Sequence, residues 1–333
     1  MRSVILSDLV NIDIRLKLDA LQPSGSFKIR GIGYACEYHA GRGAKAFLSS
    51  SGGNAGMAVA YAGKKLGIPV KVVVPETTTP RSIGLLEEDN AEVIIHGTSW
   101  LEANILAQSI KTDETAFIHP FDDELLWLGH SSMIDEIHTT EFKPDLIILS
   151  VGGGGLLAGV IQGLMKNNWE DIPIMTVETA GAASLNQSLK KGKTVELEKI
   201  SSLATSLGAK KVSEGAFQLA KGHKIASTLV SDLDTLTACE RFLSDHKILV
   251  EPACGAALSP VYNKMQDLRD FNKILVIRMA EKYLDVALFP IPGMVCFPYC
   301  SVPLHVFEPR YRAMIEDSIK HERLIGVCNT IKQ

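Results

Sequence analysis

Short apolar segments and longer amphipathic ones alternate through most of this chain. The apolar segments have strand length and lie at Ala46–Ser50, Val70–Val74, Glu92–Ile95, Ala116–Ile118, Leu146–Leu149, Ile174–Glu178 and Lys273–Ile277. Helices are predicted between them at Ala55–Leu66, Trp100–Ile110, Leu125–His138, Leu156–Asn167, Glu214–Lys221, Asp234–His246 and Ala256–Gln266. Because the strands are almost continuously apolar, the pattern predicts an α/β fold with largely parallel sheets covered on both faces. Ligands of such folds bind at the carboxyl ends of the strands.

Length and charge narrow the class of protein. The chain has 333 residues, which favours about two domains, and its hydrophobic fraction of 46% supports a buried core. Lys and Arg number 34 against 38 Asp and Glu, a net charge of −4. Because no basic excess is present, we expect neither a nucleic-acid nor a membrane partner, and small molecules become the expected ligands.

Cysteine spacing and hydropathy indicate the compartment. The six cysteines form no CxxC pair, which favours a reducing environment, and the N-terminus has no signal-peptide pattern. The uncharged run Leu146–Met165 has the length of a membrane span, but four consecutive glycines interrupt it. This run therefore reads as a strand, a tight loop and a helix, and we expect a cytoplasmic protein.

The pattern changes after Arg278. Five prolines, Pro290, Pro292, Pro298, Pro303 and Pro309, fall within twenty residues, which no regular βα unit tolerates. We place a boundary near 278–286, followed by short extended pieces and one helix at Tyr311–His321.

The first of three polar loops carries a candidate nucleophile. Lys28 follows the Ser- and Gly-rich segment Gln22–Phe27 and opens an apolar segment. An arbitrary lysine is usually a solvated charge, but a partly desolvated one has a lowered pKa and suits a Schiff base. For Arg30 the reading as a solvent-facing charge is the stronger one.

Two further loops lie between predicted strands and helices. Ser49–Gly56 reads SSSGGNAG, in which the polar residues either cap the helix or bind a carboxylate through backbone N–H groups near Gly52 and Gly53. Gly152–Gly155 enters a helix directly after a strand, as phosphate-binding loops do. It has neither the Walker A lysine nor the spacing of the G-x-G-x-x-G fingerprint, so nucleotide binding is the weaker reading.

Four motifs occur together and in order: PSGSFKIRG, SSGGNAG, SVGGGGLLAG and EPACGAAL. Over about residues 14–277 the chain resembles the L-serine dehydratase family, and in particular its serine dehydratase-like branch. This resemblance implies a tryptophan-synthase-β-like fold (fold type II), with two open, largely parallel α/β domains and pyridoxal 5′-phosphate as cofactor. Residues 1–277 would form the catalytic region, with a small domain at about 31–138 inserted in the large one.

The resemblance also implies roles for individual residues. Lys28 would be the Schiff-base lysine, Phe27 would pack against the cofactor ring, and Asn54 would contact the ring 3′-oxygen. Gly152, Gly153, Gly154, Gly155 and Leu156 would hold the phosphate. Ser51, Gly52, Gly53 and Asn54 would bind the substrate carboxylate, and Glu178, Ala182 and Leu207 match positions around a monovalent cation such as K⁺.

The implied reaction is removal of the Cα proton of an amino acid followed by loss of its β-hydroxyl. Serine would give pyruvate and ammonia, and threonine would give 2-oxobutanoate and ammonia. The chain departs from the family pattern after Lys273–Ile277, where Arg278–Glu281 replaces the usual Cys-Gly-Gly segment that contacts the pyridine nitrogen. The N-terminal lead-in also looks short.

The tail carries a second resemblance. Around PLHVFEPRYR, residues 284–333 resemble the start of the substrate-recognition domain of Lon proteases, a partial β-rich module, and no ATPase or protease part follows. Cys296, Cys300 and His305 lack a fourth convincing metal ligand, so apolar packing is the preferred reading of that cluster.

Three alternatives stay open at the level of sequence. A serine racemase shares the Cα proton removal, and a catalytically impaired fusion acting as an interaction module is favoured by the altered segment after residue 277. An NAD-dependent dehydrogenase rests only on glycine loops after strands. A homodimer is a family-level expectation.

Overall fold

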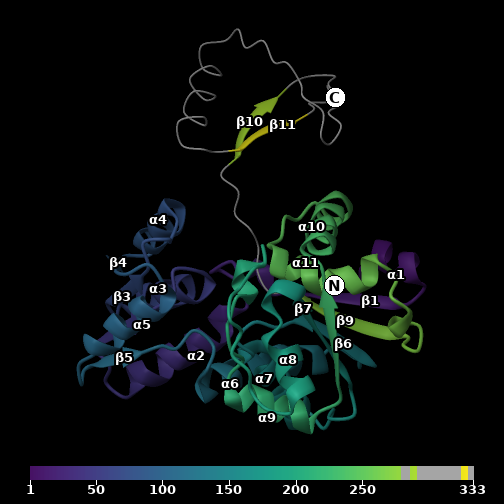
Figure 1. The fold of residues 1–333 in the computed structure, drawn as a ribbon, viewed down its shortest axis with the longest axis horizontal. Helices are drawn as coiled ribbons and strands as arrows, with labels where there is room; N and C mark the ends of the chain where they lie inside the picture. Colours follow the sequence, from purple (N-terminus) through teal and green to yellow (C-terminus); the bar gives the residue numbers. More distant parts are fainter. Residues whose placement is uncertain (279–285, 291–323, 329–333) are drawn as a thin grey trace. The chain divides into compact units, whose positions relative to one another are not determined.

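Two parallel sheets organise residues 1–278 of the computed structural model, which describes residues 1–278, 286–290 and 324–328 (Figure 1). The five-stranded sheet has the order β1 (Asp13–Leu18), β9 (Lys273–Arg278), β6 (Leu146–Ser150), β7 (Ile174–Thr179), β8 (Ile225–Val230). The four-stranded sheet has the order β4 (Ala91–Ile95), β3 (Val70–Val74), β2 (Ala46–Ser49), β5 (Thr115–Phe117). Every strand pair in both sheets is parallel, as the sequence predicts.

Helices connect these strands. They are α1 (Val4–Val10), α2 (Lys28–Gly41), α3 (Asn54–Leu66), α4 (Pro80–Glu88), α5 (Trp100–Ser109), α6 (Glu124–His138), α7 (Gly155–Lys166), α8 (Ser184–Lys191), α9 (Glu214–Gly222), α10 (Asp232–His246) and α11 (Pro252–Tyr262). Short 3₁₀ turns lie at η1 (Asp19–Leu21), η2 (Ala180–Ala182), η3 (Thr205–Leu207) and η4 (Gln266–Leu268). No helix among the residues that the structure describes is long and apolar enough to cross a bilayer. The run Leu146–Met165 is β6, a loop and α7, as predicted.

The central strands explain why the five-stranded sheet is so apolar in sequence. β9 pairs with β1 on one side and with β6 on the other, and its residues Ile274–Ile277 are buried. All five residues of β6 and all six of β7 are buried as well. A strand that is covered on both faces has apolar side chains on both faces. Burial of these strands therefore explains their continuous apolar sequences.

A continuous row of helices links the two sheets. α3 packs on α2, α2 on α6, α6 on α7, and α7 on α9. Glycines allow these close approaches: a Cβ on Gly129 would lie 2.4 Å from the carbonyl oxygen of Arg30, and one on Gly163 would lie 2.8 Å from the Ile134 side chain. The start of α2, where Lys28 lies, is therefore set by the helices of both sheets.

Several elements differ from the sequence prediction. α1, α2, α4, α8 and β8 were not predicted, and α11 begins at Pro252 and ends at Tyr262, four residues earlier at each end than predicted. Proline at the first position of a helix costs no hydrogen bond, so Pro252 marks the true start.

The chain divides into two compact units, Met1–Glu281 and Lys282–Gln333. In the second unit the structure describes a parallel pair of strands, β10 (Val286–Pro290) and β11 (Leu324–Cys328). The predicted helix Tyr311–His321 and the cluster Cys296, Cys300 and His305 lie outside the described residues.

Candidate active site

Lys28 is the first residue of α2, and its amine is held by a carbonyl from a distant part of the chain. Its Nζ donates to the carbonyl oxygen of Pro120 at 2.5 Å, in the segment that follows β5. Burial lowers the pKa of Lys28 to about 8, although the Glu251 carboxylate acts in the opposite direction. Near neutral pH the unprotonated fraction of this amine is therefore far larger than that of a lysine with the ordinary pKa of 10.5, which favours a nucleophilic or basic role.

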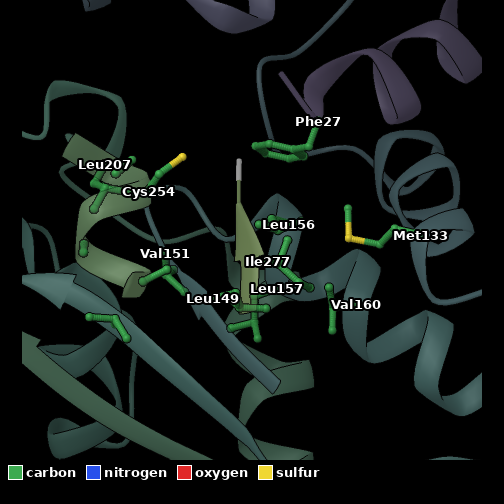
Figure 2. Close-up of a cluster of buried hydrophobic side chains, with 14 of the residues drawn as sticks. Phe27, Met133, Leu149, Val151, Leu156, Leu157, Val160, Leu207, Cys254 and Ile277 are labelled. Carbon is green, nitrogen blue, oxygen red and sulfur yellow. The ribbon is translucent and has the colours of Figure 1, made fainter. Parts of the chain in front are cut away.

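Phe27 precedes Lys28 and anchors it in the core. The Phe27 side chain is 5% exposed and belongs to the main hydrophobic cluster, together with Leu156, Ile277 and Cys254 (Figure 2). Lys28 Nζ lies 5.2 Å from the centre of the Phe27 ring. The amine thus emerges beside an apolar surface, which accounts for its desolvation.

The loop Ser51–Gly53 connects β2 to α3. Gly53 N–H donates to Ser51 Oγ at 3.4 Å, and a Cβ on Gly52 would lie 2.8 Å from the Thr78 methyl group. Asn54 begins α3, and its Nδ2 donates to both carboxylate oxygens of Glu251 at 3.3 Å. The start of α3 is therefore joined to the start of α11, because Glu251 directly precedes α11.

The tetraglycine loop follows β6 and enters α7. Gly154 has φ +96°, and a Cβ on Gly153 would lie 2.4 Å from the Phe121 ring. The first helical hydrogen bond of α7 runs from Ala158 N–H to the Gly154 carbonyl at 2.9 Å. The N–H groups before Ala158 have no helical partner, so this end of α7 presents donors suited to an anion.

His119, Pro120 and Phe121 connect the Lys28 amine to the tetraglycine loop. His119 Nδ1 accepts from the N–H groups of Phe121 at 3.2 Å and Asp122 at 2.8 Å, which turns the chain after β5. Pro120 then meets Lys28, while the Phe121 carbonyl accepts from Trp127 Nε1 at 2.9 Å. Sequence reasoning missed this segment, because its contribution is a backbone carbonyl and a ring whose contacts are distant in sequence.

Arg30 is not the solvent-facing charge that the sequence favours. Its side chain is 7% exposed and binds Asp19 and Glu136, with Nη2 at 3.0 Å from Asp19 Oδ1 and Nη1 at 2.6 Å from Glu136 Oε1. Burial opposes its charge, but the hydrogen bonds to Asp19 and Glu136 outweigh burial and raise the pKa of Arg30. This network joins the loop before Lys28 to α6.

The residues expected around a monovalent cation lie at the ends of β7, η2 and η3. Glu178 is fully buried, and its two oxygens accept from Leu185 N–H at 2.8 Å and Asn186 N–H at 2.7 Å, at the start of α8. Burial raises the pKa of Glu178 to about 7, although these hydrogen bonds oppose the shift. Ala182 is buried in η2, and a Cβ on Gly152 would lie 3.1 Å from Leu207 Cα in η3. The cation role of these three residues stays a prediction.

These elements together fit a phosphorylated aldehyde cofactor. A desolvated amine is available to bond an aldehyde, the start of α7 offers backbone N–H groups without a helical partner, and Phe27 offers an apolar face for a ring. Both the amine and the loop contact the segment Pro120–Phe121, so they lie within one neighbourhood.

Comparison with known proteins defines the class first. Residues 1–278 match the model of the pyridoxal-phosphate dependent enzyme family, and the chain belongs to that family. Residues 285–332 match the substrate-binding domain of the ATP-dependent protease La (LON). The expectations for the family, the fold and the pyridoxal phosphate cofactor are thereby confirmed.

Individual relatives indicate a narrower group than the family match does. The chain is 47% identical to mouse "L-serine dehydratase/L-threonine deaminase" over 79% of this chain and 81% of that protein. It is 43% identical to mouse "Serine dehydratase-like" over 89% of this chain and 88% of that protein. Among solved structures, the L-serine ammonia-lyase of Rhizomucor miehei superimposes with a TM-score of 0.80 at 34% identity, covering 84% of this chain and 92% of that one. The serine racemase of Dictyostelium discoideum superimposes with a TM-score of 0.76 at 26% identity, covering 85% and 91%.

Proposed function

We propose that this protein is a pyridoxal-phosphate-dependent ammonia-lyase that converts L-serine to pyruvate and ammonia, and L-threonine to 2-oxobutanoate and ammonia. The observation that carries the proposal is the desolvated amine of Lys28, held by Pro120 next to the Phe121 ring that packs on the glycine loop. The names and identities of its relatives support the choice of substrates.

The roles proposed for the cofactor residues come from the resemblance to the L-serine dehydratase family, and the positions of the loops support them. Lys28 would attach the cofactor, Phe27 would flank its ring and Asn54 would contact its 3′-oxygen. The N–H groups of Gly152–Leu156 would bind the phosphate at the start of α7. When bound, pyridoxal phosphate supplies an electron sink for the pair left behind when a proton leaves Cα.

The remaining steps belong to side chains of the protein. The loop Ser51–Asn54 would bind the substrate carboxylate through backbone N–H groups and the Asn54 amide, which fixes the Cα–H bond toward Lys28. The Lys28 amine, free to accept a proton because of its lowered pKa, would remove that proton. The Cβ–O bond would then break, and the hydroxyl would take up one proton, equal in number to the one removed from Cα, and leave as water. The resulting enamine would tautomerise to an imine, and its hydrolysis by one water would give the 2-oxo acid and ammonia.

The test combines attachment and turnover. Purified protein is incubated with pyridoxal phosphate, reduced with borohydride and digested, and the modified peptide is located by mass spectrometry. We expect the cofactor on Lys28 and pyruvate after addition of L-serine. Lys28→Ala should lose both, whereas Lys64→Ala, which removes a surface lysine paired with Asp89, should keep both. Attachment at another lysine would contradict the proposal.

A racemase is the second candidate, because a serine racemase shares the fold at 26% identity. Both reactions begin with removal of the Cα proton, so the residues assigned above serve either one. The same incubation separates them: pyruvate without D-serine supports the lyase, and D-serine as the main product supports the racemase.

The segment after β9 is expected to affect the rate of the proposed reaction. Arg278–Glu281 stands where the resembled family has Cys-Gly-Gly, so the proposal includes an activity impaired by the loss of a partner for the pyridine nitrogen. Cofactor attachment without either product would support the inactive interaction module. The same proposal includes a catalytic region at residues 1–277 with an inserted domain at 31–138. It also includes a homodimer, the K⁺ site and a cytoplasmic location.

A further inference from the structure

His130 is a buried histidine that the proposed reaction does not use. It lies in α6, is fully buried, and its Nε2 is an orphan atom, with no hydrogen-bond partner in the part of the chain that the structure describes. A buried polar atom left without a partner costs free energy, so its presence calls for a physical reason.

The other ring nitrogen caps the helix that begins at Lys28. Phe27, the residue before α2, makes no side-chain capping bond, and Arg30 N–H turns back to the Phe27 carbonyl at 3.0 Å. Gly31 N–H donates instead to His130 Nδ1 at 3.2 Å. An N–H group in the first turn of α2 is thus satisfied by a side chain from a different helix.

This contact fixes the tautomer of the ring. Because a backbone N–H only donates, Nδ1 must be unprotonated, and in the neutral imidazole the proton lies on Nε2. Burial, followed by the charges of Lys28 and Arg30 on α2, holds the pKa of His130 well below its usual range. The neighbour from α7 is the uncharged Gly159, whose Cβ would lie 2.4 Å from His130 Cβ.

The same ring supports the residue beside Lys28. The His130 and Phe27 ring centres are 4.8 Å apart at an interplanar angle of 54°. A Cβ on Gly31 would lie 2.6 Å from His130 Cε1, so the ring fits against bare backbone. His130 therefore contacts the residues on both sides of Lys28 in sequence, and α2 cannot shift along its axis without breaking one of these contacts.

From these contacts we infer that His130 is a positioning residue for Lys28, whose Nδ1 accepts from Gly31 N–H and whose ring packs on Phe27, so that it fixes the start of α2. The inference rests on the proposed role of Lys28 in holding the cofactor. The Nε2–H without a partner accompanies the unprotonated Nδ1 that Gly31 N–H requires.

The first test measures the tautomer directly. Histidine ¹⁵N NMR of the full chain without added cofactor is recorded from pH 5.5 to 8.5, and the His130 signals are assigned by their loss in a His130→Asn variant. We expect an unprotonated Nδ1, a protonated Nε2 and no titration across this range. A proton on Nδ1, or titration near the ordinary histidine pKa, would overturn the inference.

The second test uses two variants of nearly equal shape. His130→Asn keeps an acceptor at the δ position, and His130→Leu removes it, while both lose the ring beside Phe27. Titration with pyridoxal phosphate, followed by the visible absorption of the lysine-bound cofactor, should give a dissociation constant about tenfold higher for His130→Leu and within about threefold of wild type for His130→Asn. Equal weakening in both variants would show that only the volume of the ring matters.

The outcomes separate the two proposals. If borohydride places no cofactor on Lys28 of the wild-type chain, the proposed function fails while the tautomer measurement still stands. If the cofactor is on Lys28 and the two variants bind it equally, the proposed function stands and the positioning role fails. Should His130→Leu not fold, the tautomer measurement decides the question alone.

Discussion

At the scale of single residues, the Lys28 amine is set apart by its surroundings. Burial lowers its pKa from 10.5 to about 8. Competitive labelling of the protein without cofactor with an amine reagent between pH 6 and 11, read by mass spectrometry, should give a midpoint near 8 for Lys28. Surface lysines such as Lys64 in the same digest serve as the internal comparison. A midpoint near 10.5 for Lys28 would show that its amine faces water.

The same shift has a consequence for stability. The unfolded chain binds more protons at Lys28 than the folded chain between about pH 8 and 10.5, so this group makes folding more favourable as pH rises through that window. Below pH 8 the cost of burying the ammonium is fully present, and the Pro120 carbonyl offsets part of it.

A site residue could be predicted from the sequence where its neighbours in the chain form a recognisable motif. Lys28, Asn54 and Gly152–Gly155 lie in short motifs beside a strand or a helix start, so adjacent residues identify them. The Pro120 carbonyl, the Glu251 carboxylate and the His130 ring reach the site from positions about 90 to 200 residues away from their partners, and no spacing rule encodes such contacts. Arg30 was misread for the same reason, since Glu136 lies on α6.

At the scale of elements, the turn into α7 requires glycine for two reasons. Gly154 has φ +96°, and a Cβ there would lie 2.6 Å from that of Ala216. Gly154→Ala should therefore lower the stability by more than the about 1–2 kcal/mol of a left-handed alanine, and weaken pyridoxal phosphate binding at least about tenfold. Thermal unfolding and a cofactor titration measure the two effects.

Gly192 provides the matched control. It ends α8 at φ +69° with nothing within 4 Å of its would-be Cβ. Gly192→Ala should show only the backbone cost and leave cofactor binding unchanged. If the two variants weaken binding equally, the effect reports general destabilisation and the loop loses its assigned role.

Elements were predictable where burial and periodicity agree. β3 matches its prediction at both ends because all its residues except Lys71 are buried valines. β8, which reads IASTLV at the edge of its sheet, is only partly buried and has no continuous apolar run. α2 contains Gly31 and Gly33, which lower helix propensity, and Gly31 serves close packing against Leu126 and His130 of α6 rather than local structure.

At the scale of the whole molecule, a long N-terminal part and a short C-terminal part of the chain match two different families. The pyridoxal-phosphate family match ends at residue 278, the LON match begins at 285, and the division between the two compact units falls at Glu281. All strands described for the two large sheets lie before that division. The junction thus falls directly after the interior strand β9, at the point where the resembled family supplies a partner for the cofactor.

This junction makes the contribution of the tail testable. A chain ending at Glu281 keeps β9 and both sheets, so we expect it to fold, to unfold within about 4 °C of the full chain, and to attach pyridoxal phosphate at Lys28 with similar affinity. Differential scanning calorimetry and the borohydride mapping described above measure this. Loss of cofactor attachment on truncation would show that residues 282–333 complete the catalytic fold, and the impaired-fusion hypothesis would then be wrong. Retained attachment with pyruvate formation unchanged would assign the chemistry to residues 1–281 and leave the LON-like unit free for a separate role.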